Sequence, residues 1–230
     1  AQVCDTSRPP FAKWFVGGET NLCHNAVDRH AAVRPAAAAL VYVSTETGRE
    51  QIYSFAELKA EVMRMAAILQ AQGIGRGDRV LIYMPMIPEG VVAMQACARI
   101  GATHSVVFGG FSAKALQERI IDAGAVAVIT ANYQMRGGRE LPLKAIVDEG
   151  LAMGGCESIR TVFVYQRTPT ACNMVAGRDK TFTEVLAGKS SECAAEPVGA
   201  EHPLFVLYTS GSTGKPKGVQ HSTGGYLLWA

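Results

Sequence analysis

Residues 208–218, with the sequence YTSGSTGKPKG, combine glycines, hydroxyl side chains and lysines in a way that suits the binding of phosphate groups. The glycines let the backbone turn sharply, so that amide N–H groups can approach phosphate oxygens. Hydroxyl groups add donors and the lysines add positive charge. We therefore predict that the loop binds phosphates through Thr209, Ser210, Gly211, Ser212, Thr213, Gly214, Lys215 and Lys217.

The apolar run at residues 203–208 precedes this loop and predicts a buried strand, which is where ligand loops begin in open α/β sheets. A Walker A loop is a rival interpretation, but it needs the spacing Gly-x-x-x-x-Gly-Lys-Ser/Thr. Here the glycines are closer together, and Pro216 after Lys215 prevents a helix from beginning at the lysine. A solvated linker would explain the flexibility of the loop but not its paired lysines after a buried strand.

Residues 136–139, RGGR, form a second candidate phosphate site. Two guanidinium groups offer planar donors around a backbone that a ligand can approach closely. On its own, this pattern is more typical of a solvated turn than of a binding site.

The run at residues 208–218 closely resembles the phosphate loop of the acyl-adenylate-forming superfamily, which includes acyl-CoA synthetases, firefly luciferase and peptide-synthetase adenylation domains. VLIYMPMIPE (residues 80–89), ARIGATHSVVFGGFS (98–112) and MRGGRELPLK (135–144) resemble the acetyl-CoA and propionyl-CoA synthetase branch. The resemblance extends over nearly the whole chain.

Within that branch, different segments of the sequence resemble different enzymes. Residues 15–30 and 42–47 resemble propionyl-CoA synthetases, whereas residues 221–230 are more similar to acetyl-CoA synthetases. We expect propionate as the acid in preference to acetate.

The resemblance implies a ligase that attaches a short-chain carboxylate to AMP, releasing pyrophosphate from Mg²⁺-ATP, and then transfers the acyl group to coenzyme A (CoA). The expected partners are these small molecules, with neither nucleic acid nor membrane. The phosphate loop is then assigned to ATP, with Lys215 as the stronger of the two lysine candidates. The CoA site is assigned to Phe108, Gly109, Gly110, Arg136, Gly137, Gly138 and Arg139. No residue of the chain is predicted to be catalytic or to bind a metal.

Family members continue well beyond the phosphate loop. We therefore expect the chain to be the first part of the large N-terminal domain of an acyl-CoA synthetase, inactive by itself and lacking the C-terminal part. An alternative is a nucleotide- or CoA-binding module without ligase activity. A kinase-like phosphotransferase is disfavoured by the Lys215-Pro216 step.

Composition agrees with a folded α/β domain. With 48% hydrophobic and 18% charged residues in 230, the chain can bury a core and is not disordered. A net charge of +2 is far from the basic surface of a nucleic-acid-binding protein. Six cysteines without a CxxC pair argue against a zinc or redox motif and fit a cytoplasmic location.

The chain alternates between apolar runs and amphipathic stretches, which predicts a doubly wound parallel sheet with helices on both faces. We expect a peripheral segment at residues 1–35, with a short helix in it, and the AMP-binding domain at 36–230. The stripe of Phe55, Leu58, Val62, Met65 and Leu69 is expected in the core. His104 is expected to be a core histidine with satisfied nitrogens, and His221 to lie nearer the ligand. The expected strands are 40–43, 79–84, 105–108, 126–130, 161–165 and 203–208, and the helices 55–72, 88–100, 112–123 and 142–153.

Overall fold

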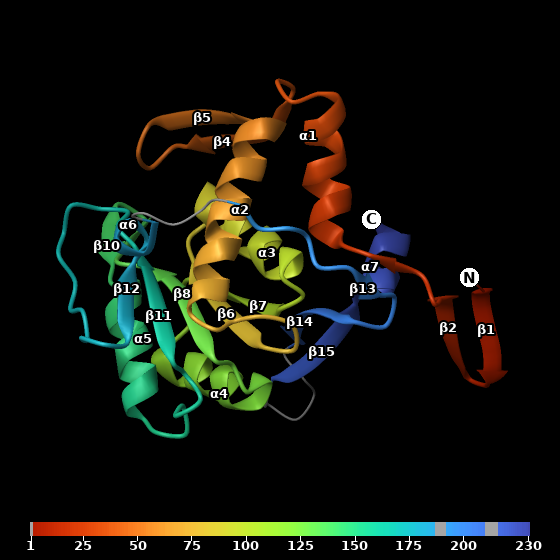
Figure 1. The fold of residues 1–230 in the computed structure, drawn as a ribbon. Helices are drawn as coiled ribbons and strands as arrows, with labels where there is room; N and C mark the ends of the chain where they lie inside the picture. Colours follow the sequence, from red (N-terminus) through yellow and green to blue (C-terminus); the bar gives the residue numbers. More distant parts are fainter. Residues whose placement is uncertain (1, 187–191, 210–215) are drawn as a thin grey trace.

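The computed structural model describes residues 2–186, 192–209 and 216–230. A seven-stranded sheet lies at its centre, with the strand order β12-β11-β8-β6-β7-β14-β15 (Figure 1). Neighbouring strands are parallel except for β15, which runs antiparallel to β14. The strands are β6 (Arg79–Met84), β7 (Thr103–Phe108), β8 (Ala127–Ala131), β11 (Thr161–Tyr165), β12 (Asp179–Thr181), β14 (Pro203–Thr209) and β15 (Lys217–Ser222).

Helices cover both faces of this sheet, which confirms the predicted doubly wound architecture. Helices α2 (Phe55–Ala71) and α3 (Pro88–Arg99) pack on one face, and α4 (Ala113–Ala123) and α5 (Leu143–Ala152) lie on the other (Figure 1). Local sequence explains the helix ends. Ser54 and Glu57 form a capping box before α2, Pro88 occupies the first turn of α3, and Gly124 ends α4 in the left-handed conformation.

The core agrees with the predicted stripe on α2. Leu58, Val62, Met65 and Leu69 are buried against the sheet, whereas Phe55 is only partly buried. Strands β6 and β8 are buried along almost their whole length, as expected for central strands covered on both faces.

The sequence prediction missed edge strand β12, since residues 167–197 were expected to be irregular apart from a short helix. That helix, α6 (Phe182–Leu186), begins at the predicted capping box of Thr181 and Glu184. Strand β12 has three polar residues and therefore no hydrophobic pattern. The fully buried ammonium of Lys144 on α5 fixes it, because Nζ lies 2.8 Å from the Asp179 carboxylate and 2.6 Å from that of Asp148.

The N-terminal segment contains the predicted helix as a π-helical turn η1 (His24–Asp28) followed by α1 (Arg29–Val33). A hairpin that was not predicted comes first and projects away from the sheet (Figure 1). The remaining elements are β1 (Gln2–Arg8), β2 (Phe11–Val16), β3 (Glu19–Thr20), β4 (Ala38–Ser44), β5 (Arg49–Ser54), β9 (Gln134–Arg136), β10 (Arg139–Leu141), β13 (Val198–Gly199) and α7 (Thr223–Trp229). No helix in the described ranges is both long and apolar enough to cross a membrane.

Candidate functional site

The predicted ligand residues come from segments that follow parallel strands. Strand β7 ends at Phe108, β8 leads into the β9–β10 hairpin, and β14 ends at Thr209. Because these strands are parallel, their carboxyl ends lie at the same end of the sheet. The fold thus brings the two candidate sites to one side of the molecule.

At this carboxyl end, Phe108 and Arg136 form a stacked pair. The guanidinium carbon of Arg136 lies 5.2 Å from the centre of the Phe108 ring, within the range of a cation–π contact. The ring is 55% exposed, so one of its faces remains open. Among the described residues, no carboxylate or carbonyl oxygen accepts a hydrogen bond from the Arg136 guanidinium, so its donors are free for an anion.

Gly109 and Gly110 are needed because neighbouring side chains lie against their backbone. A Cβ on Gly110 would overlap the guanidinium of Arg136 and lie 2.8 Å from the Phe108 ring. A Cβ on Gly109 would lie 2.6 Å from Gln134 Oε1, and the Gln134 amide donates a hydrogen bond to the Gly109 carbonyl oxygen. Gln134 therefore ties the β9–β10 hairpin to the Phe108 segment.

The RGGR motif is the tight turn of the β9–β10 hairpin. Gly137 and Gly138 both have positive φ, at 56° and 75°, which a two-residue turn of this kind requires. Arg136 and Arg139 pair directly across the two strands. Their side chains therefore leave the same face of the hairpin and can contact one ligand together.

The phosphate loop lies largely outside the described residues, which omit Ser210, Gly211, Ser212, Thr213, Gly214 and Lys215. Its flanking residues are placed. Thr209 ends β14 and pairs directly with Lys217 at the start of β15, and both are exposed. The strand before the loop was predicted, but its antiparallel return as β15 was not.

His104 is buried on β7, as predicted, but its surroundings differ from the expectation. Its Nδ1 has no hydrogen-bond partner in the described part of the chain, and burial lowers its pKa to about 4. It lines a cavity of about 430 Å³ together with Gln95, Phe205 and Tyr226. The ring of His221 stacks on that of Phe205 at 4.5 Å between centres. Its expected position near the ligand stays a prediction, because residues 210–215 of the phosphate loop lie outside the described ranges.

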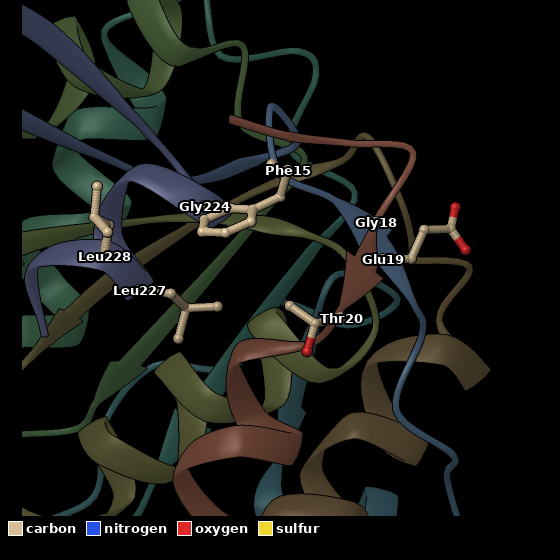
Figure 2. A pocket seen from close by; sticks show the side chains of 8 residues that line it. Phe15, Gly18, Glu19, Thr20, Gly224, Leu227 and Leu228 are labelled. Carbon is tan, nitrogen blue, oxygen red and sulfur yellow. The ribbon is translucent and has the colours of Figure 1, made fainter. Parts of the chain in front are cut away.

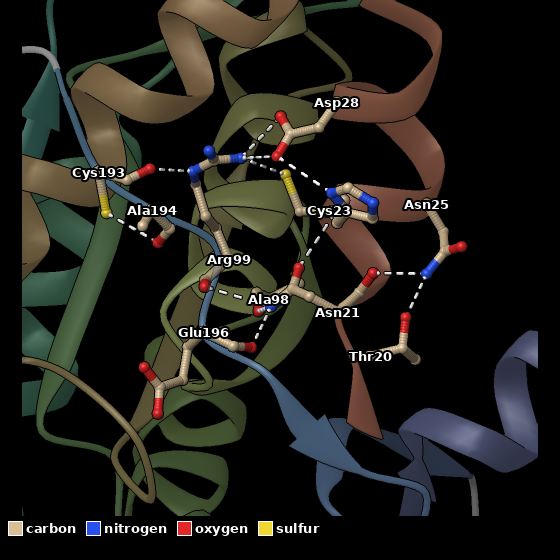
Figure 3. Close-up of polar contacts among 11 residues, drawn as sticks. Thr20, Asn21, Cys23, Asn25, Asp28, Ala98, Arg99, Cys193, Ala194 and Glu196 are labelled. Atoms are coloured by element: carbon tan, nitrogen blue, oxygen red, sulfur yellow. Dashed lines mark hydrogen bonds and ion pairs between the residues drawn. The ribbon is translucent and has the colours of Figure 1, made fainter. Parts of the chain in front are cut away.

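A polar cluster at the opposite, amino end of the sheet was not predicted (Figure 3). Arg99, at the end of α3, donates from Nη1 to both carboxylate oxygens of Asp28 at 2.9 Å and from Nε to the Cys193 carbonyl at 2.6 Å. The Asn21 amide donates to the carbonyls of Ala98, Arg99 and Glu196. These bonds fasten the N-terminal segment to α3 and to the chain before β13.

The cluster also surrounds a cysteine. The Cys23 sulfur lies 3.4 Å from Arg99 Nη1, yet burial raises the pKa of this thiol to about 11. A thiol with such a pKa stays protonated at neutral pH and is a poor nucleophile. We therefore assign the cluster a structural role.

An apolar cavity of about 400 Å³ separates the N-terminal segment from α7. Figure 2 shows Phe15 and Thr20 from the N-terminal side together with Leu227 and Leu228 of α7 around it. None of the residues that line it was predicted to bind a ligand, and its lining offers little to recognise a phosphate.

The sequence analysis also missed side chains that hold the candidate site. Tyr83 donates from its hydroxyl to the Phe111 carbonyl at 2.7 Å, and Tyr208 donates to Asp122 Oδ2 at 2.7 Å. Both tyrosines belong to strands. The hydrophobic pattern of a strand does not show whether a tyrosine hydroxyl makes a supporting hydrogen bond or the ring only packs in the core.

Comparison with known proteins agrees with this arrangement. Residues 27–230 match the family described as AMP-binding enzyme, and residues 1–26 match that described as acetyl-coenzyme A synthetase N-terminus. Proteins named acetyl-coenzyme A synthetase from Cupriavidus metallidurans and Ralstonia nicotianae are 61% and 62% identical over 229 and 230 residues. The match covers all of this chain but 35% of each of those proteins.

A solved structure shows the same fold. The acetoacetyl-CoA synthetase from Streptomyces lividans superimposes with a TM-score of 0.89 at 33% sequence identity. That match covers all of this chain and 34% of the other.

Proposed function

The chain belongs to the AMP-binding enzyme family, and we propose on that basis that the protein is an ATP-dependent ligase that joins a short-chain carboxylate to CoA. One observation supports this proposal above all. The RGGR hairpin contacts the Phe108 segment at the end of the sheet where the phosphate loop begins. Because the chain spans about a third of the length of the relatives above, the activity of the whole protein is a proposal.

For CoA, we propose binding by Phe108, Gly109, Gly110, Arg136, Gly137, Gly138 and Arg139. The open face of the Phe108 ring suits a purine, because base stacking on an aromatic side chain needs only an exposed π-face. Arg136 and Arg139 leave the same face of the hairpin and suit the phosphates next to that purine.

For ATP, we propose binding by Thr209, Ser210, Gly211, Ser212, Thr213, Gly214, Lys215 and Lys217. Exposed Thr209 and Lys217 face one another across β14 and β15, so a hydroxyl and an ammonium flank the entrance of the loop. Mg²⁺ would arrive bound to the phosphate oxygens of ATP, which is its usual mode of binding.

The reaction requires two displacements. A carboxylate oxygen of the acid attacks the α-phosphorus of ATP, and the bond to pyrophosphate breaks. The CoA sulfur, after loss of its proton, attacks the acyl carbon and AMP leaves with the bonding electrons. In the first step the loop would stabilise negative charge on the departing pyrophosphate, an electrostatic task for its amides and lysines.

We propose acetate as the acid. The names of the relatives support acetate, whereas the expected preference for propionate rests on residues 15–30 and 42–47 alone. We also propose that residues 1–35 are peripheral, that the protein is cytoplasmic, which its six free cysteines support, and that residues 1–230 alone are inactive.

The test is pyrophosphate release by the full-length protein with Mg²⁺-ATP and CoA, supplying acetate, propionate or butyrate in turn. Release that requires an acid and is fastest with acetate supports the proposal. Fastest release with propionate would correct the acid. Saturable nucleotide binding without release would favour the alternative of a binding module without ligase activity.

A further inference from the structure

A continuous series of contacts between aromatic rings and guanidinium groups runs from the proposed CoA site to the base of the phosphate loop. Arg136 stacks on Phe108, and the ring of Phe108 meets that of Phe111 edge to face at 6.0 Å between centres. The guanidinium carbon of Arg119, on α4, then lies 4.8 Å from the centre of the Phe111 ring and 5.2 Å from that of Tyr208. Arg119 thus contacts two rings, each next in sequence to a different proposed ligand segment.

Arg119 is held tightly in this position. It is 7% exposed, and Nη1 donates to the Ala115 carbonyl at 2.7 Å. No carboxylate in the described ranges lies within ion-pair distance of its guanidinium. A buried cation needs electrostatic compensation, and here the faces of the two rings provide it together with the backbone carbonyl.

Hydrogen bonds from outside the stack hold the Tyr208 side chain and the backbone of Phe111. The Tyr208 hydroxyl donates to Asp122 Oδ2 at 2.7 Å, and burial raises the pKa of this tyrosine, so it keeps the donated proton. On the other side, Tyr83 Oη donates to the Phe111 carbonyl. A shift of the Tyr208 ring therefore has to break its hydrogen bond to Asp122, and a shift of the Phe111 backbone has to break that from Tyr83.

The positions of the two rings in the sequence give this contact a functional meaning. Phe111 directly follows Gly110 of the proposed CoA site, and Tyr208 directly precedes Thr209, the first residue of the phosphate loop. We propose that Arg119 is a positioning residue that holds the CoA segment and the ATP segment in place for both nucleotides. This inference rests on the assignment of the two nucleotide sites in the proposed function.

The test measures equilibrium binding of Mg²⁺-ATP and of CoA separately, by titration calorimetry of the full-length protein without any acid. R119M removes the charge but keeps a long side chain, and it should weaken binding of both nucleotides about fivefold or more. R119K keeps a positive charge between the rings and should recover most of the loss.

The matched control is R79M. Arg79 donates to the carbonyls of Ala123, Gly124 and Gly77. It therefore supports the carboxyl end of α4, and it contacts neither the Phe111 ring nor the Tyr208 ring. It should lower stability at least as much as R119M and leave both dissociation constants unchanged. An unchanged constant for either nucleotide in R119M, equal losses in R79M, or a lysine variant as weak as the methionine variant would overturn the proposal.

A second variant keeps the test decisive if R119M fails to fold. Phe111 is 40% exposed and lies on the CoA side, so F111L should fold and yet weaken ATP binding as well as CoA binding. Unaltered ATP binding in F111L would refute the role of Arg119. Nucleotide binding can be measured without turnover. A protein that binds both nucleotides but forms no thioester would therefore refute the ligase, and the binding constants of the same variants would still test the role of Arg119. Binding of neither nucleotide would overturn both.

Discussion

An arginine lies at each end of the central sheet, and the two arginines have different roles. At the amino end, Arg99 is 4% exposed in its side chain, and Asp28, the Cys193 carbonyl and the Cys23 sulfur surround its donors (Figure 3). At the carboxyl end, Arg136 stacks on the exposed ring of Phe108, and no carboxylate or carbonyl oxygen of the described residues accepts a hydrogen bond from its guanidinium. An arginine with acceptors inside the chain stabilises the fold, whereas one with open donors is available to a ligand.

The first prediction tests the amino end, where the effect on stability is largest. Asp28→Ala would leave the buried Arg99 guanidinium without its carboxylate, which costs about 3–5 kcal/mol in such pairs. Urea denaturation should show this loss, with CoA affinity unchanged. Glu61→Ala is the control, because the exposed Arg64–Glu61 pair contributes at most about 1 kcal/mol. Equal losses for both variants would contradict the contrast between the two ends.

The second prediction concerns pH and His104, near the amino end of β7. Burial depresses its pKa from 6.5 to about 4, so between these values the unfolded chain binds a proton that the folded chain does not. Stability should therefore fall as the pH drops from about 6.5 to 4, by up to about 3 kcal/mol from this group. His104→Leu should flatten this part of the curve of unfolding free energy against pH. A curve of unchanged slope would show that His104 does not titrate in this way.

The third prediction addresses the carboxyl end. Arg136→Ala should weaken CoA binding about 10- to 100-fold, the usual loss for a charged donor to a phosphate, and change the unfolding free energy by less than about 0.5 kcal/mol. Calorimetric titration of the full-length protein with CoA measures the first quantity and urea denaturation the second. Arg64→Ala provides an exposed arginine as control. A large loss of stability with unchanged CoA affinity would make Arg136 a structural residue like Arg99.

The smallest effect is expected from one methyl group. Gly110→Ala would push the Arg136 guanidinium off the Phe108 ring and should reduce CoA affinity about tenfold. Gly75→Ala is the matched control, because its added methyl group meets nothing within 4 Å and its φ is not positive. Identical CoA titration curves for the two variants would argue against the stacked pair as the binding surface.

Much of the fold could be predicted from the spacing of hydrophobic residues and from the residues that begin or end helices. Strands 79–84 and 161–165 were predicted with the observed bounds, and the capping box of Ser54 and Glu57 marked the start of α2. The missed elements had no such signal. The three residues of β12 are polar, and the buried ion pair that holds this strand joins its Asp179 to Lys144 of α5. The exposed β1–β2 hairpin has no buried face to impose a pattern.

The candidate site was predicted in part for a similar reason. Glycines and arginines in a short run can be recognised from sequence, and the fold does bring Phe108, Gly110 and Arg136 together. The supporting side chains could not be found in this way. Gln134, Arg119 and Tyr208 act through contacts between distant parts of the chain. In the sequence, nothing distinguishes them from other residues of a helix or strand.

The Asn21 amide has a further consequence for the way the protein is made. Its partner carbonyl on Glu196 is 175 positions later in the chain. A ribosome that adds about 5–20 residues per second needs about 9–35 seconds to reach it. During that interval the newly made N-terminal segment can be held by Asn21 only through the carbonyls of Ala98 and Arg99, so its attachment to the chain before β13 forms late.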